Sequence, residues 1–222
     1  MLHSWNLTPD DAVALQHELA ARVDVAAPLG EVATVAGCDI AYHLTDPVLY
    51  AAVVVVRLSD RAEVERSVVT GEVTFPYVPG LLSFREAPAL LDAFRGLRAV
   101  PDSVMLDAQG IAHPRRFGLA CHLGLWLDLP TVGCAKSWLV GEYDEPGPTA
   151  GDVSPLTIAG EHVGDVVRSA TGANPVFVSP GHKVDVAGAT RLVRAMLSGY
   201  RHPTPTRLAH MAANDARAKA GS

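Results

Sequence analysis

Cysteine, long apolar runs and excess positive charge are all scarce in this 222-residue sequence. Its three cysteines are too few and too scattered for a disulfide framework or a zinc site, and we expect free buried thiols in a reducing cytoplasm. The longest apolar stretch, Tyr50 to Val56, is far too short to cross a membrane. Residues Met1 to Leu7 lack a basic stretch followed by an apolar run, so no secretory signal is expected.

The net charge of −6 argues against a protein that coats nucleic acid without specificity, because phosphate binding needs a basic surface. A small basic groove remains compatible with this charge, and a carboxylate-rich site is itself acidic until a metal binds. Hydrophobic residues make up 49% of the chain and charged residues 19%, which favours a sizeable core. We find no internal repeat, and the length predicts one domain over residues 1–222.

The pattern along the first half predicts a helix, three strands and a second helix. Thr8 is typical of a helix cap, and Pro9 with two acids follows it. The helix is expected to run to about Val25. β-branched, closely spaced segments then predict an antiparallel meander, and Ser83 opens a helix to about Arg98. The expected strands are Val32 to Tyr42, Leu49 to Ser59, and Ala62 to Val73.

The second half predicts shorter elements. Strands are expected at Val104 to Asp107, Thr131 to Ala135 and Val176 to Val178, and a surface loop at Glu142 to Pro155. The expected helices are Phe117 to Leu127, Val186 to Leu197 and Arg207 to Ala220. Three antiparallel strands followed by parallel strands with crossover helices give an α/β fold, a mixed sheet with helices on both faces. This order fits the ribonuclease H architecture.

Two carboxylates interrupt apolar strands. Asp39 lies within Val35 to Tyr42, and Asp107 ends Val104 to Asp107. A buried unpaired carboxylate is costly, so each needs a cation, backbone donors or a metal. If the strands are neighbours, the two side-chain roots lie roughly 5 Å apart and favour a shared Mg²⁺. Either acid alone is more often a strand-end residue that caps a turn.

Glu86 has two interpretations. Ser83-Phe84-Arg85-Glu86 matches a capping box, in which Glu86 would bond back to the Ser83 amide. It could equally be a third acid of the site, and the pattern alone does not decide between them.

Other polar residues follow strand ends or turns. His182 lies in a Pro-Gly turn after a strand and is expected at the site, whereas Asp185 is expected to cap the next helix. Lys136 is either a solvated strand-end lysine or a cation facing the scissile phosphate. His113 lies among Gln109, Arg115 and Arg116 in a segment suited to phosphate contact. His122 is expected to be a packed core histidine.

Together, several stretches resemble the endonuclease V family, in family order and over most of the chain. The most specific is the proline-tyrosine loop that runs into Arg85-Glu86. Cys38, before the first Asp, is a local variation. The matching pieces are Gly37 to Tyr42, Pro76 to Glu86, Asp107 to Gly110 with His113-Pro114-Arg115, Phe117 to Ala120 with His122 to Gly124, Gly133 to Ser137, and Ser179 to His182.

The resemblance implies a ribonuclease-H-like fold and a DNA repair endonuclease that recognises deoxyinosine. It would hydrolyse the second phosphodiester bond 3′ to the lesion and leave 3′-hydroxyl and 5′-phosphate ends. Mg²⁺ is the implied cofactor, and Mn²⁺ can substitute for it. The implied partner is deoxyinosine DNA, inosine RNA is a further candidate, no membrane is involved, and a monomer is expected.

The resemblance also implies roles for residues. Asp39, Asp107, Glu86 and His182 would bind metal, and Glu86, Lys136 and His113 would be catalytic. Tyr77 would stack where the flipped base has left, held by the stiff loop of Pro76 and Pro79. The base pocket and DNA contacts would be formed by Gly80, Leu82, Gly110, Gly118, Arg85 and Arg115. The alternative is a non-catalytic module that binds inosine nucleic acid and uses its carboxylates as structural caps.

Overall fold

A computed structural model describes residues 2–221 and contains one nine-stranded sheet in the order β3-β2-β1-β4-β5-β9-β8-β7-β6. β1 to β3 form the predicted antiparallel meander. β4 and β5 continue the sheet parallel to β1, and β9 returns antiparallel to β5. The strands are β1 Thr34–Tyr42, β2 Val48–Arg57, β3 Glu63–Glu72, β4 Ser103–Leu106, β5 Thr131–Ala135, β6 Glu142–Tyr143, β7 Val153–Ile158, β8 Glu161–Val167 and β9 Val176–His182.

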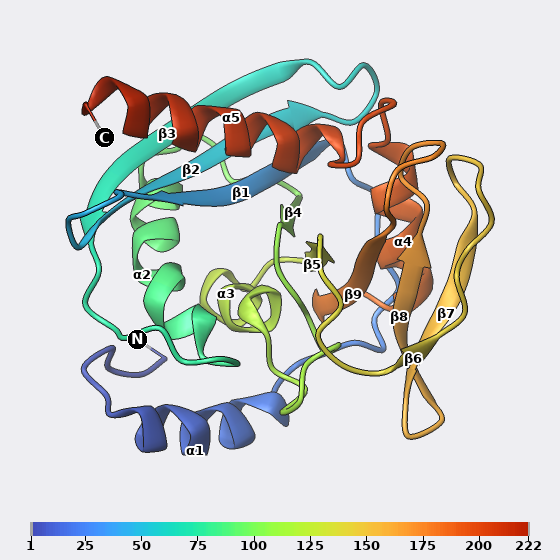
Figure 1. Cartoon of the computed structure of the whole chain (residues 1–222), viewed down its shortest axis with the longest axis horizontal. Coiled ribbons are helices and arrows are strands. Elements are labelled where there is room, and N and C mark those ends of the chain that lie inside the picture. Colours follow the sequence, from blue (N-terminus) through green and yellow to red (C-terminus); the bar gives the residue numbers. More distant parts are fainter. Residues whose placement is uncertain (1, 222) are drawn as a thin grey trace.

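Helices cover both faces of the sheet, as predicted (Figure 1). α5 lies across β1 and β2 on one face, and α4 packs on β8 and β9. On the opposite face α2 packs against β2 and β3, and α3 against β5 and β9. The helices are α1 Pro9–Ala20, α2 Leu82–Arg95, α3 Leu119–Leu127, α4 Val186–Ala195 and α5 Thr204–Lys219.

The core follows from these layers. Val54 and Val56 of β2 pack under α5, whereas Val53 and Val55 pack toward α2. Because successive side chains of a strand point to opposite faces, the run of valines in β2 serves both layers at once. All residues of β2 between its two ends are buried for this reason.

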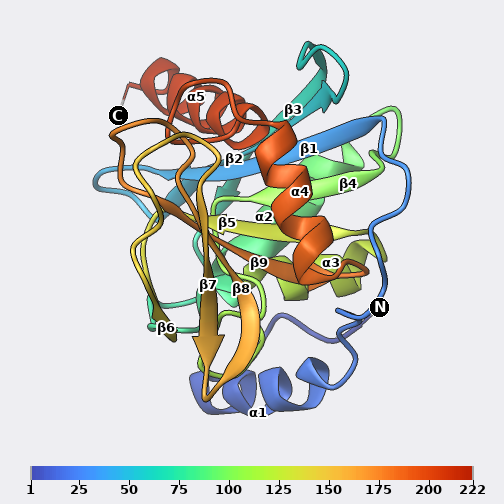
Figure 2. The same ribbon diagram turned by 90° about the vertical axis from the view of Figure 1, so that its right-hand side faces the viewer.

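The start of α1 forms as the sequence predicts. The Thr8 side chain accepts from the amide of Asp11, and the Asp11 side chain accepts in turn from the amide of Thr8. The helix ends at Ala20, five residues before the predicted end at Val25. α1 lies outside the layer of α2 and α3 (Figure 2), and its Leu19 belongs to one buried cluster with Val166 of β8 and Phe177 of β9.

One hairpin was not predicted. Residues expected to form only a loop contain the short strand β6 and the start of β7, and β8 follows where no element was expected. Pro155 and Gly164 lie inside these strands, and both residue types are typical of breaks. Strands near a sheet edge tolerate them, because fewer of their backbone groups need partners.

Cys38, Cys121 and Cys134 are free and buried, as expected. Within residues 2–221, no helix is both long and apolar enough to cross a membrane.

Candidate active site

The register of two parallel strands brings the two predicted acids together. Cys38 of β1 pairs with Leu106 of β4, so the next residues, Asp39 and Asp107, stand side by side. Neighbouring strands lie about 4.8 Å apart. Both side chains are largely buried, with 13% and 5% of their surface exposed. The predicted convergence of Asp39 and Asp107 is therefore confirmed.

Asp39 faces α5. Gly37 lies two residues earlier in β1, hence on the same face, and a Cβ atom there would stand 2.0 Å from the backbone oxygen of Pro205. This close approach brings His210 of α5 to Asp39, with 2.7 Å between Nδ1 and Oδ2. Burial, and then the charge of Asp107, raise the pKa of Asp39 above its ordinary value.

Glu86 approaches the same place from α2. α2 begins at Leu82, with Leu81 as an N-cap that makes no side-chain hydrogen bond. The capping-box interpretation of Ser83 and Glu86 is therefore wrong. Instead, Glu86 accepts a hydrogen bond of 2.8 Å from the Tyr42 hydroxyl. Burial raises the pKa of Glu86 to about 7, and the charges of Asp39 and Asp107 add to the shift.

Two cationic or potentially cationic groups lie beside Asp107. The Lys136 ammonium is 2.6 Å from Asp107 Oδ2, and His202 Nδ1 is 3.9 Å from the same oxygen. His202 and His210 also face each other, with ring centroids 5.7 Å apart. Neither histidine was singled out from the sequence. The sequence offered only a weak signal for them, namely two histidines close to the start of a polar C-terminal helix to which no function had been assigned.

The donor set fits a hard divalent cation. Three carboxylates converge, two of them with raised pKa values, and only one lysine compensates them directly. Asp107 Oδ2 is also buried without a well-directed hydrogen bond, although Lys136 lies close to it. Among residues 2–221 no three His, Cys, Asp or Glu side chains already form a metal-binding group.

His182 does not belong to this cluster. His182 pairs with Thr131, which is the first residue of β5, whereas Lys136 comes directly after Ala135, the last residue of β5. The two ends of β5 are separated by roughly 13 Å at 3.3 Å per residue. His182 Nδ1 instead accepts from the amide of Asp24. The prediction that His182 binds the metal is corrected for this reason: β9 continues through Pro180 and Gly181 and runs antiparallel to β5.

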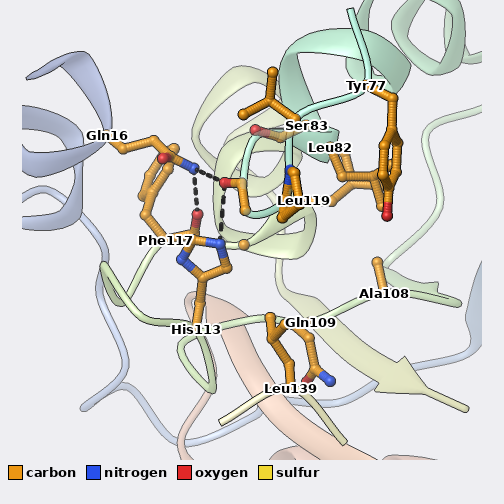
Figure 3. A pocket seen from close by; sticks show the side chains of 14 residues that line it. Gln16, Tyr77, Leu82, Ser83, Ala108, Gln109, His113, Phe117, Leu119 and Leu139 are labelled. Carbon is orange, nitrogen blue, oxygen red and sulfur yellow. Dashed lines mark hydrogen bonds between the residues drawn. The ribbon is translucent and has the colours of Figure 1, made fainter. Parts of the chain in front are cut away.

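A cavity of about 180 Å³ includes Ala108, the residue after Asp107, in its wall, and Figure 3 shows the residues that line it. Its wall includes the first residues of α2 and α3, and neither helix has a side-chain cap. Uncapped helix starts leave backbone N–H groups free to donate to a ligand. Gly80, Leu82 and Gly118 line the cavity as predicted, but Gly110 does not. A Cβ atom at Gly110 would stand 1.9 Å from the Pro180 oxygen, so this glycine serves strand packing.

The loop that carries Tyr77 is held at both ends. Tyr77 itself is 72% exposed at the cavity rim. Arg85 donates to the Phe75 carbonyl at 2.7 Å and lies over the Tyr42 ring. Gly80, with φ +80°, directs its carbonyl at three donors: Gln16 at 2.9 Å, His113 at 3.1 Å and Arg115 at 2.8 Å.

These bonds change the roles expected for two arginines. The Arg85 and Arg115 side chains are engaged with the chain itself, and they shape the Tyr77 loop rather than present free cations to DNA.

The predicted catalytic role of His113 is also corrected. Burial lowers the pKa of His113 to about 4, so the ring is neutral near pH 7 and does not offset phosphate charge. Its Nδ1 accepts from the Arg115 amide, which leaves Nε2 to donate to the Gly80 carbonyl. His113 therefore anchors the cavity wall.

The order of the strands and the acidic site together define a ribonuclease-H-like α/β protein. Its carboxylates meet where β1 and β4 lie side by side. The sequence model of the family Endonuclease V matches residues 17–211, and the chain belongs to that family. The resemblance found in the sequence is thereby confirmed. Family membership makes the protein a nuclease, that is, a phosphodiester hydrolase.

Individual relatives agree with this assignment. An Endonuclease V from Dehalococcoides mccartyi is 48% identical over 212 residues, which is 96% of this chain and 95% of the relative. The crystal structure of Endonuclease V from Streptomyces avermitilis is 40% identical, with a TM-score of 0.92 over 99% of this chain and 97% of that one. An Endonuclease V from Ciona intestinalis is 24% identical and shares the fold, with a TM-score of 0.86 over 96% of this chain and 100% of that one. That protein was solved in complex with a 23mer DNA containing an inosine followed by a ribo-adenosine.

Proposed function

We propose that the protein is a repair endonuclease that recognises deoxyinosine in DNA and cuts the second phosphodiester bond on its 3′ side. The products would carry 3′-hydroxyl and 5′-phosphate ends. The observation that carries the proposal is the position of the acids: Asp39, Glu86 and Asp107 converge next to a base-sized cavity. The Ciona relative solved with inosine DNA supports the same substrate class.

Asp39, Glu86 and Asp107 would hold Mg²⁺, for which Mn²⁺ could substitute, since these ions favour carboxylate oxygen ligands. When bound, such an ion supplies Lewis acidity and makes a water molecule more acidic. His210 fixes the orientation of Asp39 through the 2.7 Å contact. Lys136 lies at the same carboxylates and would place positive charge near the non-bridging oxygens of the scissile phosphate.

The cavity would receive the hypoxanthine base after it leaves the duplex. The N–H groups of Leu82 and Leu119, the first residues of α2 and α3, suit the base oxygen, because neither helix start has a side-chain cap and such groups can donate to it. The Tyr77 ring at the rim would stack in the space that the base has left, and inosine in RNA would fit the same cavity. The loop anchors at Gly80 favour this role, since they hold Tyr77 in place before the substrate arrives.

A nicking assay tests the acids. Asp39→Asn and Asp107→Asn should each abolish Mg²⁺-dependent cutting of an inosine oligonucleotide, because each removes a ligand charge. Asp92→Asn, at an exposed acid of α2, is the matched control and should cut like the wild type. Mapping of the product ends tests the position of the cut.

Cutting that survives EDTA, or in both acid variants, would remove the metal proposal. Tight inosine binding without any cutting by the wild type would indicate the alternative, a binding module.

Tyr77 allows a separate prediction. Stacking of a base on an aromatic ring is worth about 1–3 kcal/mol, so Tyr77→Ala should weaken inosine DNA binding roughly tenfold or more. Tyr77→Phe keeps the ring and should bind like the wild type. Because the side chain is 72% exposed, neither change should lower the melting temperature much. Equal affinity of Tyr77→Ala and the wild type in a fluorescence anisotropy titration would rule out the wedge.

A further inference from the structure

A serine in the cavity wall has a fully buried histidine behind it. Ser83, on the second residue of α2, lines the cavity beside Leu82 (Figure 3). Its hydroxyl oxygen lies 2.9 Å from Nδ1 of His122. His122 is 0% exposed, as expected for a packed histidine. Its contacts extend away from the cavity.

The hydrogen-bond chain continues to the N-terminal segment. His122 Nε2 lies 2.6 Å from His3 Nε2. The Trp126 indole donates to the same His3 nitrogen at 3.2 Å. The other His3 nitrogen, Nδ1, is 2.8 Å from the Ser4 carbonyl. Four side chains from three parts of the sequence thus form one chain.

The outer end of this chain determines where its protons lie. A carbonyl can only accept, so His3 Nδ1 carries the His3 proton. An indole can only donate, so His3 Nε2 has no proton. His122 must then donate from Nε2, which leaves its Nδ1 without a proton. The Ser83 hydroxyl therefore donates its hydrogen to His122.

The reverse arrangement is unfavourable at two contacts. It would place the Trp126 N–H against a His3 N–H, and a bare His3 nitrogen against the Ser4 oxygen. A second proton on either ring would also disrupt the chain. Burial opposes that proton, because it lowers the pKa of both His122 and His3.

The consequence for the cavity is a hydroxyl with one fixed polarity. A free serine hydroxyl rotates and can donate or accept. Ser83 lines the cavity although it is only 2% exposed, and because its hydrogen is committed to His122, its oxygen can act toward a ligand only as an acceptor. Gln109, also in the cavity wall, shows the same polarity: its amide nitrogen donates to the Ser137 carbonyl, and its oxygen is buried without a partner.

We propose that Ser83 is a specificity-determining residue that accepts a hydrogen bond from an N–H group on the edge of the bound base, with His122 and His3 as positioning residues. This inference rests on the proposed function. Hypoxanthine carries a hydrogen on N1, whereas N1 of adenine has a lone pair. The Ser83 oxygen attracts the N1 hydrogen of hypoxanthine and repels the N1 lone pair of adenine. In this way it helps the site to reject undamaged adenine.

The test compares substrates that differ at N1 and at the neighbouring C6 substituent, and it reads how each variant changes that difference. Oligonucleotides with inosine, with adenosine, or with unsubstituted purine riboside, which lacks the N1 hydrogen, are cut under single-turnover conditions. The readout is the ratio of inosine to purine-riboside cutting, so a general loss of activity cancels. Ser83→Ala should lower this ratio about tenfold, which is the effect of one lost hydrogen bond. The cutting of inosine DNA should slow down, while the cutting of purine-riboside DNA should stay the same.

Variants of the positioning residues separate polarity from packing. His122→Asn keeps an acceptor near the Nδ1 position and should keep the wild-type ratio. His122→Phe keeps the shape without the acceptor and should lower it. His3→Ala and His3→Gln form a second pair in the N-terminal segment, which keeps the test decisive if the buried variants do not fold. His3→Gln should keep the wild-type ratio, and His3→Ala should lower it.

An unchanged ratio in Ser83→Ala, or an equal loss on all substrates, would overturn the inference. An unchanged ratio in both folded His122→Phe and His3→Ala would overturn the positioning roles. Failure of the wild type to prefer inosine over adenosine would instead overturn the proposed function, so the two failures are distinguishable.

Discussion

At the scale of single residues, the three acids of the site differ in how their charge is compensated. Asp107 has Lys136 and Asp39 has His210, whereas Glu86 is hydrogen-bonded to the neutral hydroxyl of Tyr42 and has the charge of Arg85 only as its weakest influence. Because Glu86 has the weakest compensation of the three, burial raises its pKa to about 7. A divalent cation at the site would favour the charged form of all three, so metal binding should release protons near neutral pH.

His113 leads to a prediction about stability. Its pKa is about 4 in the folded protein, against 6.5 for an unperturbed histidine, so the unfolded chain binds more protons between these values. Unfolding free energy is therefore lost as the pH falls from about 6.5 toward 4, by about 3 kcal/mol in full. His113→Gln removes this titration and should flatten the pH dependence of urea unfolding in that window.

His17→Gln serves as the control, because His17 is exposed on α1 and should leave the slope as in the wild type. A wild-type slope in His113→Gln would show that His113 does not carry this pH dependence.

At the scale of elements, the packing of α5 on β1 links stability to the site. The space between them is too small for a side chain at Gly37, where a Cβ atom would meet the Pro205 backbone. Gly37→Ala should push α5 outward, cost about 1–3 kcal/mol as overpacking does, and move His210 away from Asp39. Nicking should fall even where the variant is fully folded.

The measurement combines thermal unfolding with single-turnover nicking at a temperature where each variant is folded. Gly30→Ala is the matched control, since nothing lies within 4 Å of its added Cβ atom. Full nicking by folded Gly37→Ala would disprove the link between this contact and the site.

The elements also show which parts of the fold could be predicted from sequence. The meander and the strand ending at Asp107 were predictable, because apolar runs interrupted by a single carboxylate are a local signal. The position of His210 was not, because it depends on α5 crossing β1, a contact between residues 171 positions apart. The capping-box match of Ser83 and Glu86 failed because α2 begins one residue before Ser83, so Ser83 is not the N-cap.

His182 failed for a related reason: a Pro-Gly pair indicated a turn, but β9 runs through it. Close packing of Gly181 on the Thr131 side chain and the Ala120 backbone makes this continuation possible. Such close approaches between distant segments are set by tertiary packing, which a single-sequence pattern does not contain.

At the scale of the whole molecule, the distribution of charge limits how DNA can be held. The net charge is −6, and at least eight of the 18 lysines and arginines pair with carboxylates. Others donate to backbone carbonyls, among them Arg85, Arg115 and Arg201. Few cations are therefore free for phosphates, and under the proposed function the affinity for DNA would come mainly from the cavity, the Tyr77 loop and the proposed metal site.

This distribution predicts a weak salt dependence of DNA binding. Each phosphate contact contributes about −0.9 to the slope of log K against log salt on duplex DNA. With few free cations, we expect a slope of only about −2 to −4, compared with about −10 for a protein that makes many phosphate contacts. Titrations of inosine DNA between 50 and 300 mM salt, at constant Mg²⁺ with the Asp107→Asn variant that is expected not to cut, measure it.

Matched adenine DNA separates the two sources of affinity. Its binding should be weak at every salt concentration, because it lacks the base contact that supplies most of the free energy. The difference between inosine and adenine DNA should stay nearly constant with salt, since contacts inside a cavity release few counterions. A steep slope with a salt-dependent difference would mean that phosphate contacts dominate, and that the paired arginines open toward DNA when it binds.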